Sequence, residues 1–146
     1  MNQMLKDLQV QIISPTGIIY TKRASRCHVK TIAGGMTILS NHVPVMTVLD
    51  ISAVVVYPLD EEAPEDYIAI NGGLLQLRDN DLTIIANMAV RARDIDDARA
   101  RVDKTMAEDA MKQAKINSDI RAYQSAEIEL KKALNKLDVL KHRHNM

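Results

Sequence analysis

The stretch RDIDDARAR, Arg93 to Arg101, separates strand-like sequence before it from alanine-rich sequence with charged helix formers after it. Asp94 is a natural N-cap for a helix that starts here, and Asp97 then falls at the third helical position. Aspartates at the positive end of a helix dipole are favourable by about 0.3–1 kcal/mol each. Arg99 is explained less well, because it faces the unfavourable end of the dipole, although it can pair with Asp96. The stretch therefore predicts a helix start at a domain boundary.

Residues 8–90 read as short strands separated by turns. Runs rich in β-branched residues alternate with clusters of Gly, Pro, Asn and Asp, and no long helical period interrupts them. This pattern is typical of a β-sandwich or a barrel. We expect an N-terminal antiparallel β-sandwich domain over residues 1–90. Because the chain has no Phe and no Trp, its core must be built mainly from aliphatic side chains and Met.

Residues 91–146 are expected to form an antiparallel hairpin of two helices. Gly and Pro are absent after Ala92, and the only turn-like cluster includes Ser118, a candidate N-cap for the second helix. Each helix carries an apolar stripe, and the stripe of the first has smaller side chains. The stripes are Ile95, Ala98, Val102, Met106, Ala110 and Ala114 on the first helix, and Tyr123, Ala126, Leu130, Ala133, Leu137 and Leu140 on the second. The predicted fold class is α+β.

The contact surface between the two predicted helices, called the seam below, is rich in alanine. Burying such a seam therefore contributes little free energy of stabilisation. Each buried carbon returns about 0.8 kcal/mol, whereas ordering the backbone costs about 1–2 kcal/mol per residue. Small side chains also let helices approach closely, so a tight and permanent hairpin is the alternative. Since the first helix has so few bulky residues, we favour a hairpin that is only marginally held.

The formal net charge of zero argues against a nucleic-acid-binding protein, because phosphate affinity needs a clustered cationic face. Residues 1–90 carry six basic and nine acidic side chains, whereas residues 91–146 carry thirteen and ten. A single cysteine, Cys27, excludes an internal disulfide framework. No segment approaches the roughly 18 apolar residues of a membrane span, and the N-terminus lacks a signal-peptide core. We therefore expect a cytosolic protein unless a partner holds it at a membrane.

The sequence has none of the motifs of a common enzyme. It contains no Gly-rich phosphate loop of the Walker type, no Cys and His cluster with metal-ligand spacing, and no nucleophile elbow. The pair Gly72-Gly73 lies between strand-like runs and indicates a bulge or tight turn. We predict a protein that is not an enzyme, with no catalytic residues, no metal site and no required cofactor.

Three blocks of the sequence resemble the epsilon subunits of bacterial F-type ATP synthases. IDDARA, Ile95 to Ala100, matches that family's I-D-x-x-R-A pattern at the start of the C-terminal helices. GGMTILSNHVPVMTVL, residues 34–49, resembles its G-E-L-G-I-L-P-G-H-A-P-L-x-T-x-L block. YIAINGGLLQLRDNDLTIIA, residues 67–86, resembles its Y-I-A-V-S-G-G-x-L-E-V block followed by V-T-I-L-A. Their order and spacing agree with the family over residues 8–140.

The resemblance implies a β-sandwich bound beside the gamma subunit at the foot of the central stalk, touching the c subunits of the rotor ring. The hairpin would lie folded on the sandwich or rise along gamma toward the alpha and beta subunits, where it inhibits ATP hydrolysis. Such a subunit is non-catalytic, couples ion translocation to ATP synthesis, and is peripheral at the cytoplasmic face of the bacterial membrane. A marginal seam suits this switch, because a bistable element needs two arrangements only about a few kcal/mol apart.

Some bacterial members of the family bind ATP on the folded hairpin through the I-D-x-x-R-A motif and further basic residues. The resemblance implies that adenine faces the motif's first residues and that cations hold the phosphates. The aspartates at the helix start would repel a triphosphate, so the phosphates would lie deeper. The implied nucleotide-binding residues are Ile95, Asp96, Arg99, Ala100, Lys132 and Lys136.

The sequence departs from the ATP-binding pattern at several positions. Lys132 and Lys136 stand where the strongest binders carry arginine, Met106 replaces another arginine, and Val90 stands where some members have glutamate. Lysine offers a point charge where arginine offers a bidentate fork. We therefore expect ATP to act as a weak regulatory ligand or not to bind.

Lys131, Lys132 and Lys136 lie in a basic run on the second predicted helix. Such a run is most often a solvated helix face. In the family, basic residues of the raised hairpin meet an acidic loop of the catalytic beta subunit, which makes these lysines candidates for the inhibitory contact. The alternative is a free-standing ATP-sensing or scaffold adaptor of the same fold, which would stay in the soluble fraction instead of leaving membranes with gamma and the rotor ring.

Overall fold

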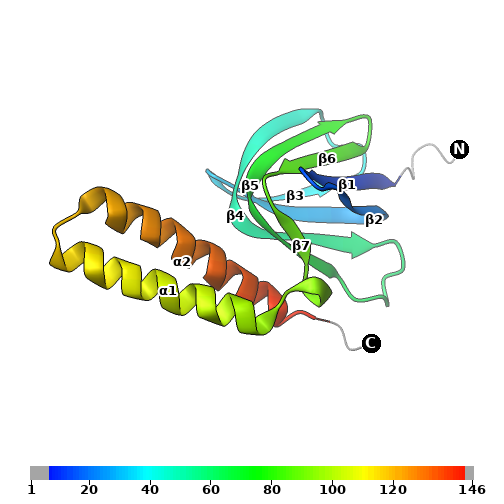
Figure 1. The fold of residues 1–146 in the computed structure, drawn as a ribbon. Helices are drawn as coiled ribbons and strands as arrows, with labels where there is room; N and C mark the ends of the chain where they lie inside the picture. Colours follow the sequence, from blue (N-terminus) through cyan, green and yellow to red (C-terminus); the bar gives the residue numbers. More distant parts are fainter. Residues whose placement is uncertain (1–6, 144–146) are drawn as a thin grey trace, which may run out of the picture.

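The computed structural model describes residues 7–143; residues 1–6, where the absence of a signal peptide was inferred, and 144–146 lie outside it. The elements follow the predicted order of strands first and helices last (Figure 1). They are β1 (Leu8–Ser14), β2 (Gly17–Thr31), β3 (Gly34–Leu39), β4 (Val45–Pro58), β5 (Asp66–Arg78), β6 (Asp81–Ala86), β7 (Ala89–Arg91), the 3-10 turn η2 (Ala92–Asp94), α1 (Asp97–Ile116) and α2 (Ile120–Leu140). The predicted α+β class, a β-sandwich followed by a helical hairpin, is confirmed.

The strands form one sheet that folds over and closes on itself. Its order is β1-β6-β5-β4-β2-β3. Because β1 also pairs with β2, these strands close into a ring, and β3 lies outside the ring beside β2. The pair β1–β6 is parallel, with Val10 opposite Leu82, whereas the neighbouring pairs are antiparallel. Closure leaves β1 and β6 with no free edge.

The interior of the sandwich is aliphatic, as its composition predicts. Burial alternates strictly along β1, which is the period-2 pattern of a strand with one face in a core. Fully buried side chains come from most strands, and each buried Val, Leu or Ile contributes about 1.5–3 kcal/mol relative to an exposed one. Cys27 is among them, and burial raises the pKa of its thiol to about 12. The largest include Leu8, Ile12, Ile38, Ile68, Ile70, Leu75 and Ile84.

Helix α1 starts later than the sequence predicted. Its N-cap is Asp96, whose carboxylate accepts a hydrogen bond from the backbone N–H of Arg99 at 3.1 Å. The prediction that Asp94 is the N-cap is wrong, because η2 ends at Asp94 and Ile95 is extended, with φ −75° and ψ 128°. Asp97 is therefore the first helical residue and not the third.

Helix α2 is also capped by a different residue. Asp119 accepts a hydrogen bond from the backbone N–H of Ala122 at 3.0 Å. The prediction of Ser118 is wrong, because Ser118 adopts φ 55° in the turn between the helices. An N-cap needs extended backbone, which Asp119 has.

The predicted stripe of α2 is confirmed, since each of its residues is buried or half-buried. The predicted stripe of α1 is largely wrong. The buried residues of α1 are Ala100, Ala107 and Ala114, whereas Val102 and Met106 are exposed. The helices pack closely through small side chains, and a face carrying valine and methionine would hold them apart. Because α1 packs on α2 and has little contact with the strands, its bulkier residues have no core to enter.

The hairpin meets the sandwich mainly through α2, which lies against β4 and β5 (Figure 1). The apolar cluster at this junction is small: only Ala69, Ala92, Ile95 and Val139 are buried at its centre among the described residues. The far ends of both helices project beyond the sheet (Figure 1). Between residues 7 and 143, neither helix is long and apolar enough to cross a membrane.

Candidate functional site

The residues of the predicted nucleotide motif meet at the base of the hairpin. Ile95, Asp96, Arg99, Ala100 and Lys136 line one cavity of about 200 Å³. The first four lie at the start of α1, and Lys136 lies in the second half of α2. An antiparallel hairpin brings these regions together because its second helix returns to the base of the first.

A second cavity of about 560 Å³ adjoins the first and shares Arg99, Asp103 and Lys136 with it. Lys132 lines this second cavity, so the structure brings all the predicted nucleotide-binding residues together around two adjoining spaces. Its wall also includes Asn71 of β5, whose side-chain oxygen is buried without a hydrogen-bond partner.

Three of these residues have structural roles. The side chain of Ile95 is 5% exposed and packs in the apolar cluster between sheet and hairpin. Ala100 is 2% exposed in the α1–α2 seam. The carboxylate of Asp96 caps α1. Helix capping and packing therefore account for these residues without a ligand, and their part in nucleotide binding stays a prediction.

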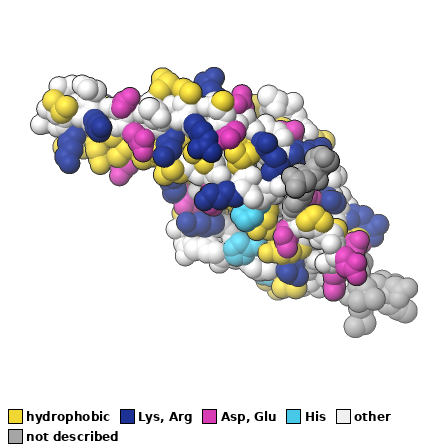
Figure 2. Space-filling model, turned by 90° about the horizontal axis from the view of Figure 1, so that it is seen from below, with side chains coloured by type: hydrophobic (Ala, Val, Ile, Leu, Met, Phe, Trp, Pro, Cys, Tyr) yellow, Lys and Arg dark blue, Asp and Glu magenta, His cyan; other side chains and the backbone are white. Residues whose placement is uncertain are grey.

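The charges around the two cavities are mixed. Arg99 Nε donates to Asp103 at 3.0 Å, and Lys132 pairs with Glu129 at 3.1 Å. Lys136 forms no ion pair with any residue between 7 and 143. Figure 2 shows Lys and Arg interspersed with Asp and Glu along the helices, without a continuous cationic face. A triphosphate would therefore meet carboxylates as well as cations.

The two uncharged departures from the ATP-binding pattern also lie at these cavities. Val90 lines the first and Met106 lines the second. Neither side chain can donate or accept a strong hydrogen bond. Their position agrees with the expectation of weak ATP binding or none.

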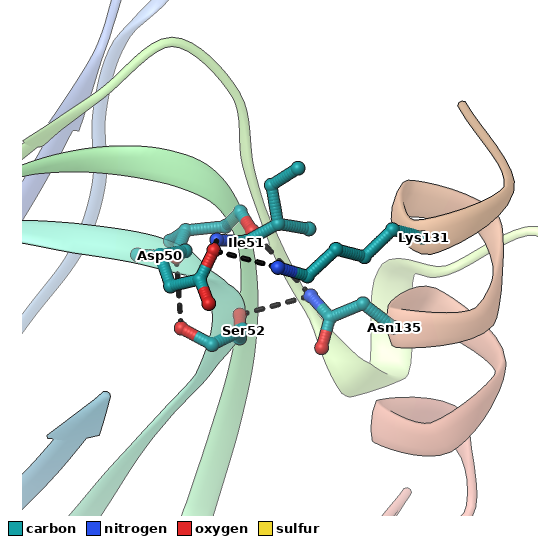
Figure 3. Close-up of polar contacts among 6 residues, drawn as sticks. Asp50, Ile51, Ser52, Lys131 and Asn135 are labelled. Atoms are coloured by element: carbon teal, nitrogen blue, oxygen red, sulfur yellow. Dashed lines mark hydrogen bonds and ion pairs between the residues drawn. The ribbon is translucent and has the colours of Figure 1, made fainter. Parts of the chain in front are cut away.

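A polar clasp joins α2 to β4 beside the apolar junction. Lys131 Nζ lies 2.8 Å from Asp50 Oδ1 (Figure 3). One turn further along α2, Asn135 Nδ2 donates to the carbonyl oxygens of Ser52 at 2.9 Å and Ile70 at 3.4 Å. The clasp therefore consists of one ion pair and one bridging amide, which reach from the same face of α2 to two neighbouring strands.

The ion pair of this clasp changes the acidity of Asp50. The hydrogen bond from Lys131 lowers the pKa of the Asp50 carboxyl below its ordinary value, and a bond from the Ile51 backbone N–H acts in the same direction. Partial burial opposes both effects. The carboxylate is therefore held in its charged form while the hairpin is docked.

The candidate inhibitory lysines do not share one environment. Lys131 forms an ion pair with Asp50 of the sandwich, and Lys132 forms one with Glu129 of its own helix. Lys136 faces the two cavities. All three lysines lie on α2, but among them only Lys131 forms an ion pair with a residue of the described strands.

Comparison with known families matches both parts of the chain. Residues 7–92 match the family described as ATP synthase, Delta/Epsilon chain, beta-sandwich domain. Residues 93–141 match ATP synthase, Delta/Epsilon chain, long alpha-helix domain. The chain belongs to the ATP synthase delta/epsilon family. The resemblance to epsilon subunits of bacterial ATP synthases is confirmed.

Curated relatives within the family are similar over nearly their whole length. The ATP synthase epsilon chain of Latilactobacillus sakei is 40% identical over 137 residues, which covers 94% of each chain. The corresponding chain of Lactobacillus helveticus is 41% identical over 135 residues, which covers 92% of each.

Solved structures show the same fold at lower identity. A chain in the Euglena gracilis mitochondrial ATP synthase (OSCP/F1/c-ring) superposes with a TM-score of 0.76 at 18% identity, covering 92% of this chain and 81% of that one. A chain in the central stalk and c-ring of the Tetrahymena thermophila enzyme gives 0.55 at 14%, covering 91% and 96%. As a family member of this fold, the chain is a central-stalk epsilon subunit of an F-type ATP synthase.

Several residues that contact the hairpin could not be predicted from the sequence. Asp50 and Ser52 lie inside a strand, and Asn135 is a single amide in a helix, so no local pattern links them. Val139 is buried at the junction although it lies outside the predicted stripe. Contacts across about 80 residues of chain are set by the docking of two domains, which local periodicity does not encode.

Proposed function

We propose that this chain is the non-catalytic regulatory subunit of its ATP synthase and couples ion translocation to ATP synthesis. Its hairpin rests on the sandwich and, when raised, inhibits ATP hydrolysis by contact with the alpha and beta subunits. The supporting observation is the contrast between a closed strand domain and a hairpin docked through α2 by a small apolar cluster and a few polar contacts. Assembly would hold the chain peripherally at the cytoplasmic face of a bacterial membrane.

An exposed apolar row on the sandwich is the proposed contact with gamma. Val48, Leu74 and Ile85 are paired across β4, β5 and β6, so their side chains lie side by side on one face. Each is exposed, by 49%, 38% and 53%. An unpartnered apolar row of this kind marks an interaction surface. A central-stalk position leaves gamma as its occupant, with the c subunits of the rotor ring at an adjoining surface.

Substitution of one residue tests this contact. Leu74→Lys places a charge in the middle of the row and should weaken binding to gamma by at least about tenfold in a direct binding measurement. Leu59→Lys alters another exposed leucine and serves as the control. Equal binding by both variants would exclude the row as the contact. A chain that never binds gamma or the rotor ring would support the free adaptor instead.

Raising the hairpin exchanges one set of partners for another. Leaving the sandwich breaks the Lys131–Asp50 pair, which as a largely exposed pair is worth only about 0.2–1 kcal/mol. Lys131, Lys132 and Lys136 then become available to an acidic surface on the beta subunit. We propose these lysines as the inhibitory contact, with a strength that falls as salt rises.

The assembled enzyme tests the inhibitory role. Replacing Lys131, Lys132 and Lys136 by alanine should relieve the inhibition of ATP hydrolysis. A matched variant with Lys104, Lys112 and Lys115 of α1 replaced by alanine removes the same charge from the other helix and should retain inhibition. Unchanged inhibition in the first variant would rule out the role of these lysines.

ATP is proposed as a weak ligand at the base of the hairpin, held by Arg99, Lys132 and Lys136 beside Ile95, Asp96 and Ala100. The support is that these residues line two adjoining cavities. Calorimetric titration of the isolated chain should show weak binding that Arg99→Gln abolishes. Absence of heat at millimolar ATP would remove the site, without affecting the proposed role of the hairpin.

A further inference from the structure

The C-terminal end of the described chain folds back onto the segment that connects the two domains. After α2 ends at Leu140, Arg143 reaches the connection between η2 and α1. Its Nη2 donates to the carbonyl oxygen of Ile95 at 2.6 Å, and its Nε donates to that of Ala92 at 3.4 Å. Figure 1 shows the end of α2 beside this connection. The guanidinium of Arg143 therefore bridges two carbonyl oxygens of the Ala92–Ile95 connection, which would be the hinge if the hairpin moved.

The preceding residue holds the same end to the sheet. The ring of His142 stacks on the ring of Tyr67 in β5, with centroids 3.7 Å apart and planes inclined by 5°. Tyr67 borders the apolar junction that contains Ile95 and Val139. His142 and Arg143 thus contact two different parts of the base, the outer face of β5 and the connecting segment.

These contacts resemble the Lys131–Asp50 pair in leaving the helix, and they differ from the ion pairs that lie within one helix. Lys141 pairs with Asp138 on its own helix, as Arg101 pairs with Asp97 and Arg99 with Asp103. Such pairs move with the helix and do not resist its departure. The contacts of Arg143 and His142 join the end of α2 to residues 67, 92 and 95, so α2 cannot leave the base of α1 without breaking them.

We propose that His142 and Arg143 form a C-terminal latch that keeps the hairpin docked by fastening the end of α2 to its own hinge. This inference rests on the proposed function of the hairpin as a movable inhibitor. The chain passes from the sandwich to the helices through the Ala92–Ile95 connection. The latch adds a breakable link at this connection, so the end of α2 as well as the start of α1 is attached to the base while the hairpin is docked.

The latch also joins the hinge to the cavities. Ile95 presents its carbonyl to Arg143 and its side chain to the junction that borders the smaller cavity. A movement that draws Ile95 away from the sheet therefore disturbs the latch and the cavity wall together. Release of the latch should accordingly be detectable at the hinge itself and not only in the assembled enzyme.

Hydrogen exchange of the isolated full-length chain tests the latch, with amides 95–100 as the readout. Arg143→Gln removes the guanidinium and should increase hinge opening by about three- to tenfold, because a charged donor to two partly exposed carbonyls is lost. Arg143→Lys keeps the charge but cannot reach both carbonyls and should fall between. Lys141→Gln removes the same charge two residues away and should leave exchange unchanged.

The outcomes separate the latch from the proposed function. Equal exchange in Arg143→Gln and Lys141→Gln would overturn the latch, whatever the enzyme does. Faster exchange in Arg143→Gln alone would support it. Adding the same variants to the assembled ATP synthase then tests the regulatory role: stronger inhibition with Arg143→Gln is expected, and an unchanged hydrolysis rate despite faster hinge exchange would contradict the inhibitory hairpin but not the latch.

Discussion

The sandwich and the hairpin are stabilised in different ways. In the sandwich, large aliphatic side chains from both ends of the sheet interlock, and β1 closes the path of strands. In the hairpin, the α1–α2 seam buries mainly alanines, and only α2 rests on the strands. A regulatory element is drawn from the weakly held part of a molecule.

The largest expected effect is in the sandwich core. Ile68 is fully buried, so Ile68→Ala should lower the global free energy of unfolding by about 2–5 kcal/mol through lost burial and the cavity left behind. Ile120→Ala removes an exposed isoleucine from the start of α2 and should change it by less than about 0.5 kcal/mol. Chemical denaturation followed by circular dichroism measures both. Similar losses would contradict the assignment of stability to the sandwich.

A smaller effect is expected in the helical seam. Ala107 is buried between α1 and α2, so Ala107→Leu should overpack the seam and destabilise the hairpin by about 1–3 kcal/mol while the sandwich stays folded. Ala98→Leu makes the same change on the exposed face that periodicity had assigned to the seam. Helical signal on heating distinguishes them. If Ala98→Leu were the more damaging, the observed face of α1 would be in error.

The smallest effect is a pH dependence of docking. Docking lowers the pKa of the Asp50 carboxyl through its hydrogen bond with Lys131. The ion pair therefore stabilises the docked hairpin fully above the ordinary carboxyl pKa of about 4. This stabilisation of docking is lost as the pH falls through the lowered pKa of Asp50. Hairpin opening should rise by about two- to fivefold across this window. Asp50→Asn should open to the same extent at every pH. Distances between probes at the hairpin tip and on β3 measure the opening, and an unchanged dependence in Asp50→Asn would exclude this pair as its source.

The comparison also explains which features the sequence predicts. In β1, burial alternates with residue number, so this strand follows from local pattern alone. The sequence reads as short strands throughout residues 8–90, whereas β4 and β5 are continuous strands of 14 and 13 residues. In α1, alanine is frequent on several faces, and the choice of Ala100 and Ala107 over Ala98 depends on where α2 lies. The N-cap is Asp96 and not Asp94, because β7 and η2 extend as far as Asp94 and α1 can begin only after them.

In the candidate site, too, residues that are neighbours in the sequence could be predicted, and contacts between distant elements could not. Its motif residues could be named from the family pattern, because IDDARA is contiguous in the chain. Lys131–Asp50 and Arg143–Ile95 could not, since each joins residues from different elements whose approach is fixed only by docking. Both contacts join α2 or the residues after it to another part of the base.

Native-state hydrogen exchange of the intact chain tests most directly whether the hairpin opens separately from the sandwich. The amides of α1 and α2 should exchange through an opening that costs far less than global unfolding and exposes little surface, whereas the amides of β4 and β5 should exchange only when the whole domain unfolds. Exchange of helices and strands at one common free energy, with one common denaturant dependence, would contradict an independently movable hairpin.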